Sequence, residues 1–384
     1  MKANEQRPRS APLLLMTPGP TRIPERVLHA GSRPMIHHRT PEFSAELATA
    51  LELLAPVFGT QHTPLPIHTT GRGGLEATIC NLFSRGEEIA VCCNGKFGEM
   101  WAGLAESYGV IAHRWSTNWE RDADPGELAA LLDDQRNVKA VALAYGDTST
   151  GVANDVPAIA RVARAHGALV MVDAVSSLGG MPFAFDEWDL DVAVTASQKC
   201  LMSGPGLAWV ALSERAWRAE WTSRLPRNYW NFAEVKRSIG RPRPETPGTP
   251  PVQIVLQVAE ALRMMHEEGL ENIYARHEAM ARRARAGAAT LGLSLQCPNI
   301  ARHSATLTAV AVPPRIAAKP LRDKIRARGI LTAAGLGTFE TTAIRIGHMG
   351  DIRVSDVDLT LEALGEALRE TPDPPAGATQ AESV

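Results

Sequence analysis

A lysine and an aspartate that each follow a short apolar run could carry out chemistry together. Leu169 to Val172 is apolar and rich in valine, which is typical of a buried parallel strand, and Asp173 follows it directly. A second run, Val192 to Ala196, ends just before Ser197-Gln198-Lys199. Ligands of open α/β sheets bind beyond the carboxyl ends of the strands, so both side chains are expected at one edge of a sheet.

This pair suits pyridoxal 5′-phosphate. A lysine amine can form an imine with the cofactor's aldehyde, and a carboxylate can hold the proton on its ring nitrogen. An isolated aspartate and lysine would more often be a helix cap and a solvated side chain, so the interpretation needs support from the rest of the chain. With that support, we predict that Lys199 and Asp173 are catalytic.

The support comes from six segments in a fixed order: TPGP (17–20), GRGGLEA (71–77), NGKFG (94–98), VDAVSSLGG (172–180), SQK (197–199) and RIGHMG (345–350). Together they resemble class V aminotransferases of pyridoxal phosphate fold type I, especially the branch that includes alanine-glyoxylate and serine-glyoxylate aminotransferases. The resemblance covers residues 15 to 368, and VDAVSSLGG followed by SQK is its most specific part. It implies an α/β fold, with a mostly parallel doubly wound sheet in a large domain and a smaller C-terminal α+β domain.

The cofactor phosphate is expected at the glycine-rich stretch 69–74. A glycine-rich loop before a helix (Leu75 to Phe83) exposes unpaired N–H groups and the positive end of the helix dipole, which suits a dianion. The dinucleotide pattern GxGxxG fails because Glu76 occupies the place of its last glycine. Arg72 departs from the family, where histidine or a small residue is common. Its guanidinium could pair with the phosphate or with a second acidic group on the substrate.

The resemblance assigns further positions around the cofactor. Phe97 falls where the family stacks an aromatic ring on the pyridine, and Thr148 falls at a hydroxyl position beside the cofactor. A core role for Phe97 and a turn-capping role for Thr148 remain open alternatives. Thr249 matches a segment that reaches the partner subunit's phosphate, and Thr246 stands where many members have tyrosine, which puts one phosphate hydrogen bond in doubt. The predicted cofactor-binding set is Thr70, Gly71, Arg72, Phe97, Thr148, Asp173, Val175, Gln198, Lys199 and Thr249.

Two residues are predicted to contact the substrate. Arg345 can pair with an α-carboxylate through two parallel N–H bonds, which a lysine cannot do. Gly19 lies in the turn 17–20 and would permit close approach of the backbone to a ligand, although an ordinary N-terminal turn is an equal alternative. The freed amine of Lys199 would then take the Cα proton and return it to the cofactor.

The expected organisation has four parts. Residues 1–20 line the site, 21–265 form the large cofactor-binding domain, 266–371 form the small domain, and 372–384 are disordered. Residues 225–251 show little periodicity and are expected to form a long functional or interfacial excursion. Ser355 and Asp358 are predicted to cap the final helix.

Composition restricts the partners. The 384 residues carry a formal net charge of −2, and neither half is strongly basic, which argues against nucleic acid and anionic membranes as partners. The five cysteines lack metal-ligand spacing, and His37-His38 would point in opposite directions on an extended segment, so no metal site is expected. Without a membrane-length apolar run or a signal peptide, a cytoplasmic enzyme is expected.

The expected function is pyridoxal phosphate-dependent transamination of a small amino acid such as alanine or serine, with glyoxylate or pyruvate as the acceptor. The resemblance also implies a homodimer with a shared active site. Three alternatives remain: a 2-aminoethylphosphonate-pyruvate or ureidoglycine-glyoxylate aminotransferase, a cysteine desulfurase, and a non-catalytic regulator that binds the cofactor.

Overall fold

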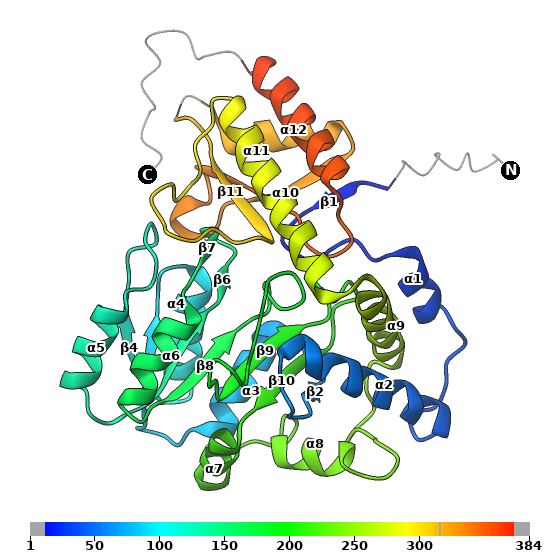
Figure 1. The fold of residues 1–384 in the computed structure, drawn as a ribbon, viewed down its shortest axis with the longest axis vertical. Coiled ribbons are helices and arrows are strands. Elements are labelled where there is room, and N and C mark those ends of the chain that lie inside the picture. The colour runs from blue at the N-terminus through cyan, green and yellow to red at the C-terminus, as the bar shows by residue number, and fades with distance from the viewer. Residues whose placement is uncertain (1–11, 315, 372–384) are drawn as a thin grey trace, which may run out of the picture.

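The chain folds into two parts, each built on its own β-sheet (Figure 1). The computed structural model describes residues 12–314 and 316–371. The predicted disordered tail, 372–384, and the first eleven residues lie outside the described residues. Among the described residues, no helix is long and apolar enough to cross a membrane.

The larger sheet has seven strands in the order β2-β10-β9-β8-β5-β3-β4. Strand β10 runs in the opposite direction to the other six strands, and the remaining pairs are parallel, so the prediction of a mostly parallel sheet is confirmed. Because βαβ crossovers cover a parallel sheet on its faces, its inner strands β5, β8 and β9 are buried along most of their length. The strands are β2 (Leu65–Ile67), β3 (Glu88–Cys92), β4 (Ile111–Trp115), β5 (Val138–Ala144), β8 (Leu169–Asp173), β9 (Val192–Ala196) and β10 (Ala208–Leu212).

Helices alternate with these strands, as the sequence pattern predicts. Asp124 and Asp155 cap two of them, each accepting a hydrogen bond from a backbone N–H of the first turn. For Asp155 the donor is the backbone N–H of Ala158, at 3.2 Å. The helices are α3 (Gly71–Leu82), α4 (Lys96–Ser107), α5 (Pro125–Asp134), α6 (Val156–Ala165), α7 (Glu214–Thr222) and α8 (Phe232–Ile239).

The smaller sheet has four strands in the order β1-β12-β13-β11. The N-terminal strand β1 pairs in parallel with β12, so the start of the described chain joins a sheet that is otherwise built from its last hundred residues. This sheet packs against α10, α11 and α12 around a second apolar core. Its elements are β1 (Leu14–Met16), β11 (Leu307–Ala311), α11 (Ala318–Ala327), β12 (Ile330–Ala334), η1 (Gly337–Phe339), β13 (Ala343–Gly347) and α12 (Val354–Arg369).

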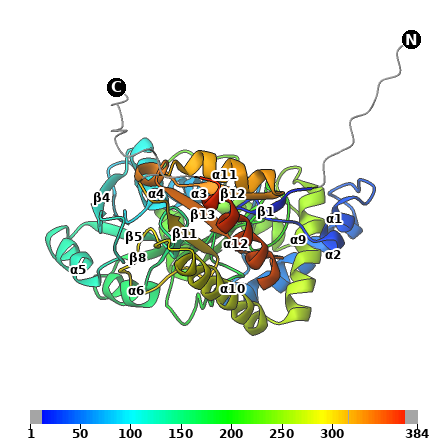
Figure 2. The ribbon, with the colours of Figure 1, turned by 90° about the horizontal axis from the view of Figure 1, so that it is seen from above.

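Two long helices connect the two parts. Helix α9 (Val252–Glu268) packs against α1 (Glu25–Gly31) and α2 (Pro41–Phe58), and α10 (Leu270–Thr290) rises to the smaller sheet (Figures 1 and 2). Gly269, with φ of +83°, joins them because it adopts a backbone conformation that other residues rarely reach. The predicted division between the domains at residues 265 and 266 falls near the end of α9 and stays a prediction.

The structure corrects the sequence interpretation at two places. Helix α3 begins at Gly71, so the glycines predicted to lie in a loop form its first turn. The excursion 225–251 contains α8. Two short strands, β6 (Gly146–Asp147) and β7 (Val152–Ala153), pair with each other after β5.

The predicted cap of the final helix is also wrong. Helix α12 begins at Val354, so Ser355 and Asp358 lie within it. The side chain of Asp356 instead accepts a hydrogen bond of 2.9 Å from the backbone N–H of Arg353. Ser355 and Asp358 stand three residues apart, and so do Arg353 and Asp356. The prediction chose the later pair, whereas the hydrogen bond at the start of the helix joins the earlier one.

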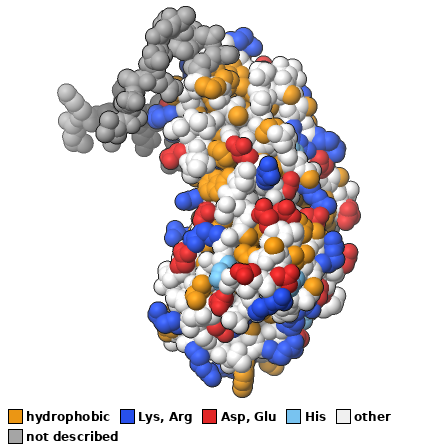
Figure 3. Space-filling view, turned by 90° about the vertical axis from the view of Figure 1, so that its left-hand side faces the viewer, with side chains coloured by type: hydrophobic (Ala, Val, Ile, Leu, Met, Phe, Trp, Pro, Cys, Tyr) orange, Lys and Arg blue, Asp and Glu red, His pale blue; other side chains and the backbone are white. Residues whose placement is uncertain are grey.

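Charges of both signs are interspersed on the face that carries β4 and α5, as Figure 3 shows. The described residues of this face present no large patch of a single sign.

Candidate active site

Lys199 lies in the turn that follows β9, and the N-terminal segment packs directly against it. Its Nζ donates a hydrogen bond to the backbone carbonyl of Pro18. Thr21 fixes the same turn from the other side. Its hydroxyl donates to the carbonyl of Lys199 at 2.9 Å, and its N–H donates to the carbonyl of Gln198 at 3.1 Å. The segment after β1 therefore holds the lysine turn in place.

Gly19 is where the segment comes closest to the lysine side chain. A Cβ at residue 19 would lie 2.6 Å from Nζ and 2.7 Å from Cε of Lys199. The φ of Gly19 is +123°, which residues with a side chain rarely adopt. The positive φ favours glycine at residue 19, and an added Cβ would displace the end of the lysine side chain. The contact of Gly19 with a substrate stays a prediction.

Asp173 ends β8, the strand beside β9, and its side chain is only 6% exposed. The N–H of Val175 donates to its Oδ1 at 2.9 Å. Burial raises the pKa of Asp173 to about 7, an increase that the hydrogen bond from Val175 opposes. Burial lowers the pKa of Lys199 to about 8, and the negative charge of Asp173 partly opposes that decrease. The lysine is therefore much closer to its neutral, nucleophilic form at neutral pH than an exposed lysine is.

A second buried carboxylate, Asp147, was missed by the sequence analysis. It is 1% exposed and lies just beyond the end of β5. Its Oδ2 accepts a hydrogen bond of 3.0 Å from the N–H of Phe97, and its Oδ1 accepts from the N–H of Ser149 at 2.8 Å. An acidic residue after an apolar strand, the same signal that identified Asp173, could have found it.

Phe97 and Thr148 lie on either side of this carboxylate. Phe97 is in the first turn of α4 and is partly buried. Thr148 is 3% exposed, and its backbone carbonyl accepts a hydrogen bond of 3.0 Å from Nη1 of Arg345. The structure therefore brings the predicted ring-stacking residue and the predicted hydroxyl, from two different segments, to the same carboxylate.

Arg345 reaches this turn from the smaller sheet. It lies at the centre of β13 and is 8% exposed. Its Nε donates to the carbonyl of Ala334 at 2.6 Å, so the bonds to Ala334 and Thr148 fix the plane of the guanidinium. Burial lowers its pKa to about 10, while the negative charge of Asp147 opposes the decrease. The arginine remains cationic at neutral pH and joins the two parts of the molecule.

The start of α3 presents the predicted phosphate site. Thr70 is the N-cap residue, and its carbonyl accepts from the N–H of Gly74, whereas the N–H groups of residues 71–73 find no acceptor in the described chain. A Cβ at Gly71 would lie 2.8 Å from a methyl carbon of Val175, so glycine lets Val175 pack against the helix start. Thr70 and Arg72 are exposed.

These residues fit a bound cofactor. The side-chain oxygen of Gln198 is buried and has no hydrogen-bond partner in the described part of the chain, although it adjoins Lys199. A buried unpaired oxygen is costly unless a ligand or water satisfies it. Together with the free N–H groups at residues 71–73, it leaves donors and acceptors where the predicted cofactor would bind.

Thr249 is the predicted residue that stands apart from this group. It is exposed, and no hydrogen bond joins it to another predicted site residue in the part of the chain that the structure describes. Arg39 fixes its loop by donating to the carbonyl of Thr246 at 2.7 Å, and the Thr246 hydroxyl donates to the carbonyl of Gly248 at 2.7 Å. The same loop lines a cavity of about 210 Å³ with His68, two residues before Thr70. The role of Thr249 toward a partner subunit stays a prediction.

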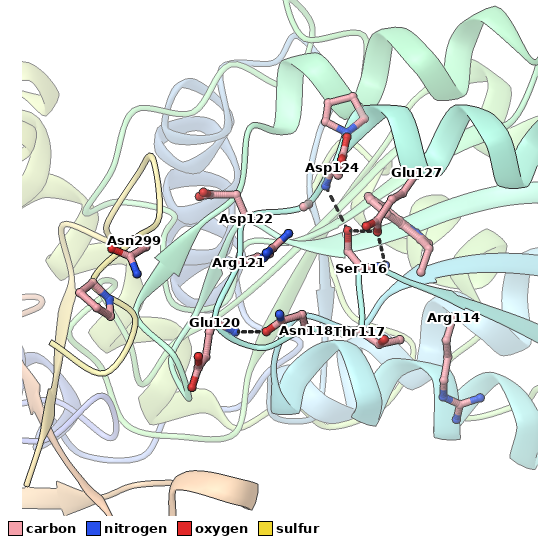
Figure 4. A pocket seen from close by; sticks show the side chains of 14 residues that line it. Arg114, Ser116, Thr117, Asn118, Glu120, Arg121, Asp122, Asp124, Glu127 and Asn299 are labelled. Carbon is pink, nitrogen blue, oxygen red and sulfur yellow. Dashed lines mark hydrogen bonds between the residues drawn. The ribbon is translucent and has the colours of Figure 1, made fainter.

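A larger cavity, of about 1030 Å³, lies beyond the edge strand β4 and contains none of the predicted site residues. Glu120, Asp122 and Asn299 gather at one end of it, with Arg121 between them and the residues at the other end (Figure 4). Its lining carries both charge signs and is separate from the group around Lys199.

Comparisons with known proteins agree with this fold. The family model described as Aminotransferase class-V matches residues 14–359. A protein named soluble hydrogenase, small subunit, from Synechococcus sp. (strain PCC 6716) is 38% identical over 93% of each chain. An L-aspartate–glyoxylate aminotransferase of Paracoccus denitrificans (strain Pd 1222) is 34% identical over 88% of this chain and 86% of its own. The crystal structure of an alanine–glyoxylate aminotransferase from Nostoc sp. has a TM-score of 0.88, with 29% identity over 96% of this chain and 100% of that one.

The fold is that of pyridoxal phosphate fold type I enzymes. The chain belongs to the class V aminotransferase family.

Proposed function

We propose that this protein is a pyridoxal 5′-phosphate-dependent aminotransferase. It transfers the amino group of a small amino acid, such as alanine or serine, to glyoxylate or pyruvate. The observation that carries the proposal is the position of Lys199, whose amine is buried beside the strand that ends in Asp173 and has a lowered pKa. The names of the two aminotransferase relatives support glyoxylate as an acceptor.

The bound cofactor would supply an aldehyde for the amine and a protonated ring that withdraws electrons from the substrate's Cα. Asp173 is suited to hold the proton on the ring nitrogen, because a buried carboxylate is stabilised as an anion by a cation beside it. The amides of residues 71–73 and Arg72 are suited to hold the phosphate. Phe97 is suited to lie against the ring face.

The chain's own residues then handle the substrate. Arg345 is cationic and fixed in orientation, so it can bind a planar carboxylate. The amine of Lys199 can take a proton from the substrate's Cα and give it back, because its lowered pKa lets it act as a base and then as an acid near neutral pH. Gly19 keeps the space beside this amine open.

We also propose a homodimer in which Thr249 of each subunit contacts the phosphate at the other site. Its exposure, and the attachment of its loop through Arg39 beside the cavity at His68, support this arrangement. A monomer with full activity in solution would contradict it.

Two alternatives differ in their support. Arg72 is exposed at the start of α3, which favours a donor with a second anionic or polar group as the second candidate, such as 2-aminoethylphosphonate or ureidoglycine. A cysteine desulfurase needs a thiolate that reaches the cofactor, but all five cysteines are buried, and burial raises the pKa of Cys200, the one beside Lys199, to about 12. That observation disfavours desulfurase chemistry.

The test has two stages. The purified protein is first incubated with pyridoxal 5′-phosphate, reduced with borohydride and digested, and the mass gain is located. A gain on the peptide that contains Lys199 is expected, and a protein that gains no mass would overturn the proposal. Alanine, serine, aspartate and 2-aminoethylphosphonate are then offered with glyoxylate or pyruvate, and the products are identified. Turnover without cofactor attachment at Lys199, or attachment without transamination of any donor, would favour a different function or a regulator.

A further inference from the structure

The buried carboxylate of Asp147 has contacts that none of the roles above uses. Its Oδ1 accepts hydrogen bonds from the N–H and the hydroxyl of Ser149, at 2.8 and 2.5 Å. The Ser149 hydroxyl oxygen in turn accepts a hydrogen bond of 2.9 Å from the N–H of Lys96. With the bond from Phe97 to Oδ2, the carboxylate joins the turn after β5 to the first turn of α4.

The packing around Asp147 shows how close these two segments come. A Cβ at Gly95 would lie 2.2 Å from the carboxyl carbon of Asp147, so only glycine lets the loop before α4 reach it. Gly95 is extended, with φ of 178°, which means that space rather than backbone conformation requires glycine here. The carboxylate of Asp147 and the hydroxyl of Ser149 therefore set the separation between Phe97 and the turn 147–149 together.

The same turn also contacts Arg345, the predicted substrate-binding arginine. Thr148, between Asp147 and Ser149, accepts the hydrogen bond from Nη1 of Arg345 through its carbonyl. Any shift of the turn relative to α4 would change both the position of the Phe97 ring and that of the guanidinium. One short segment thus connects the predicted ring platform to the predicted carboxylate anchor, which come from different parts of the chain.

The charge of Asp147 acts on the same groups. Burial raises the pKa of Asp147, and its hydrogen bonds oppose that increase. Its negative charge raises the pKa of Asp173 and that of Arg345. An anion here therefore favours a cation on the cofactor ring and keeps Arg345 charged in a buried setting.

We infer that Asp147 is a positioning residue that fixes the distance between the cofactor ring and the substrate's carboxylate by tying the Phe97 turn to the Thr148–Arg345 contact. The inference rests on the proposed function. A purely structural cap for α4 is the competing explanation, and the two differ in what a substitution changes.

Asp191 offers a matched control for that distinction. It is also an aspartate 1% exposed, and it accepts a hydroxyl bond of 2.6 Å from Ser213 and an N–H bond of 2.9 Å from Val170. It precedes β9, at the opposite edge of the sheet from Lys199. Asp191→Asn removes a buried charge, which lies 3.7 Å from Arg164 and 3.6 Å from Arg215, without touching the proposed site.

The experiment compares Asp147→Asn, Asp191→Asn and the wild-type protein in three measurements: the melting temperature, the dissociation constant of pyridoxal 5′-phosphate, and KM and kcat for the preferred donor. An asparagine has one acceptor oxygen where the carboxylate uses two, so one of the N–H donors in Asp147→Asn faces an amide NH₂ instead. Both variants are expected to have a lower melting temperature than the wild-type protein. Only Asp147→Asn should weaken cofactor binding about tenfold or more and raise KM about tenfold with a smaller change in kcat.

Each outcome decides something. If Asp147→Asn binds cofactor and donor like the wild type, or if Asp191→Asn shows the same losses, the inference is overturned. If Asp147→Asn does not fold, Ser149→Ala takes its place, because it removes the hydroxyl between Asp147 and Lys96 but keeps the charge. Ser149→Ala should shift both constants in the same direction by less, and unchanged constants would overturn the inference. A wild-type protein that takes up no cofactor would instead defeat the proposed function.

Discussion

Gly19 and Lys199 occupy adjoining space so closely that a single added carbon cannot fit between them. A Cβ at residue 19 would lie 2.6 Å from both Cδ and Nζ of the lysine. The lysine amine also donates to the carbonyl of Pro18, so the N-terminal segment contacts the end of this side chain at two adjacent residues. An added Cβ at residue 19 would push the end of the side chain away from this position.

Gly19→Ala should therefore displace Lys199 and abolish most of its reaction with pyridoxal 5′-phosphate, read as mass gain after borohydride. The positive φ alone costs about 1–3 kcal/mol of stability. Gly206→Ala is the matched control, because Gly206 has a similar φ of +134° but its Cβ would meet atoms only at 3.9 Å or beyond. The control should lose comparable stability and keep cofactor attachment. Equal attachment in both variants would show that the close contact is unimportant.

The lowered pKa of Lys199 gives a second prediction, tested on the cofactor-free protein. The amine reacts only when neutral, so its labelling by a neutral amine-reactive reagent should rise with pH and level off above about 8. The labelling of Nα-acetyl-lysine, whose side-chain amine is exposed to water, should continue to rise well beyond that pH. In Asp173→Asn the midpoint should fall further, since the carboxylate raises the lysine's pKa. A midpoint near 10 in the wild type would refute the burial of a reactive amine.

The sequence predicted much of this arrangement because its signals are local. Strand β9 was predicted with the bounds that the structure shows, since it is an apolar run with clear ends. The placement of Lys199 and Asp173 beyond adjacent strands followed from the rule that ligands bind at the carboxyl edge of such sheets.

The parts that were missed depend on contacts between distant residues. Strand β1 has three residues and gains its partner β12 from more than 300 residues away, so no local pattern marks it. Asp147 gains its role from the N–H of Phe97, fifty residues earlier, and from a glycine at residue 95 that leaves room for it. The hydrogen bond from Arg345 to the Thr148 carbonyl is a backbone contact, which side-chain patterns cannot reveal.

Asp173→Asn should stabilise the cofactor-free protein in a pH-dependent way. The pKa of Asp173 is raised from 3.8 to about 7 in the folded state, so the wild type loses stability as pH rises from about 4 to 7, and asparagine does not titrate. Melting temperatures should therefore match near pH 4 and diverge in favour of the variant up to pH 7, where the difference in the free energy of unfolding reaches about 4 kcal/mol. With cofactor and substrate, the variant should lose most of its turnover. A constant difference between the proteins at all pH values would contradict the raised pKa.

Arg345→Lys should separate substrate binding from cofactor binding. Lysine keeps a positive charge but cannot hold both carbonyls and a carboxylate in one plane, so kcat/KM should fall by about tenfold to a hundredfold, equivalent to about 1.5–3 kcal/mol. The dissociation constant of the cofactor should stay near that of the wild type. Arg328→Lys, a change of an arginine that pairs with Glu366 far from the site, serves as the control and should leave both quantities unchanged. A normal kcat/KM in Arg345→Lys would remove this arginine from the proposed site.

The role of Arg72 can be assigned by a substitution combined with a change of ligand. The residue is exposed at the start of α3, beside the free amides of residues 71–73. If its guanidinium binds the cofactor phosphate, Arg72→Met should weaken pyridoxal 5′-phosphate about tenfold and leave pyridoxal, which lacks the phosphate, unchanged. Arg121→Met, at an exposed arginine in the separate cavity of Figure 4, should change neither affinity. If Arg72→Met instead leaves the cofactor affinity intact and raises KM only for donors with a second anionic group, the arginine binds the substrate and not the cofactor phosphate. That outcome would support the second candidate function.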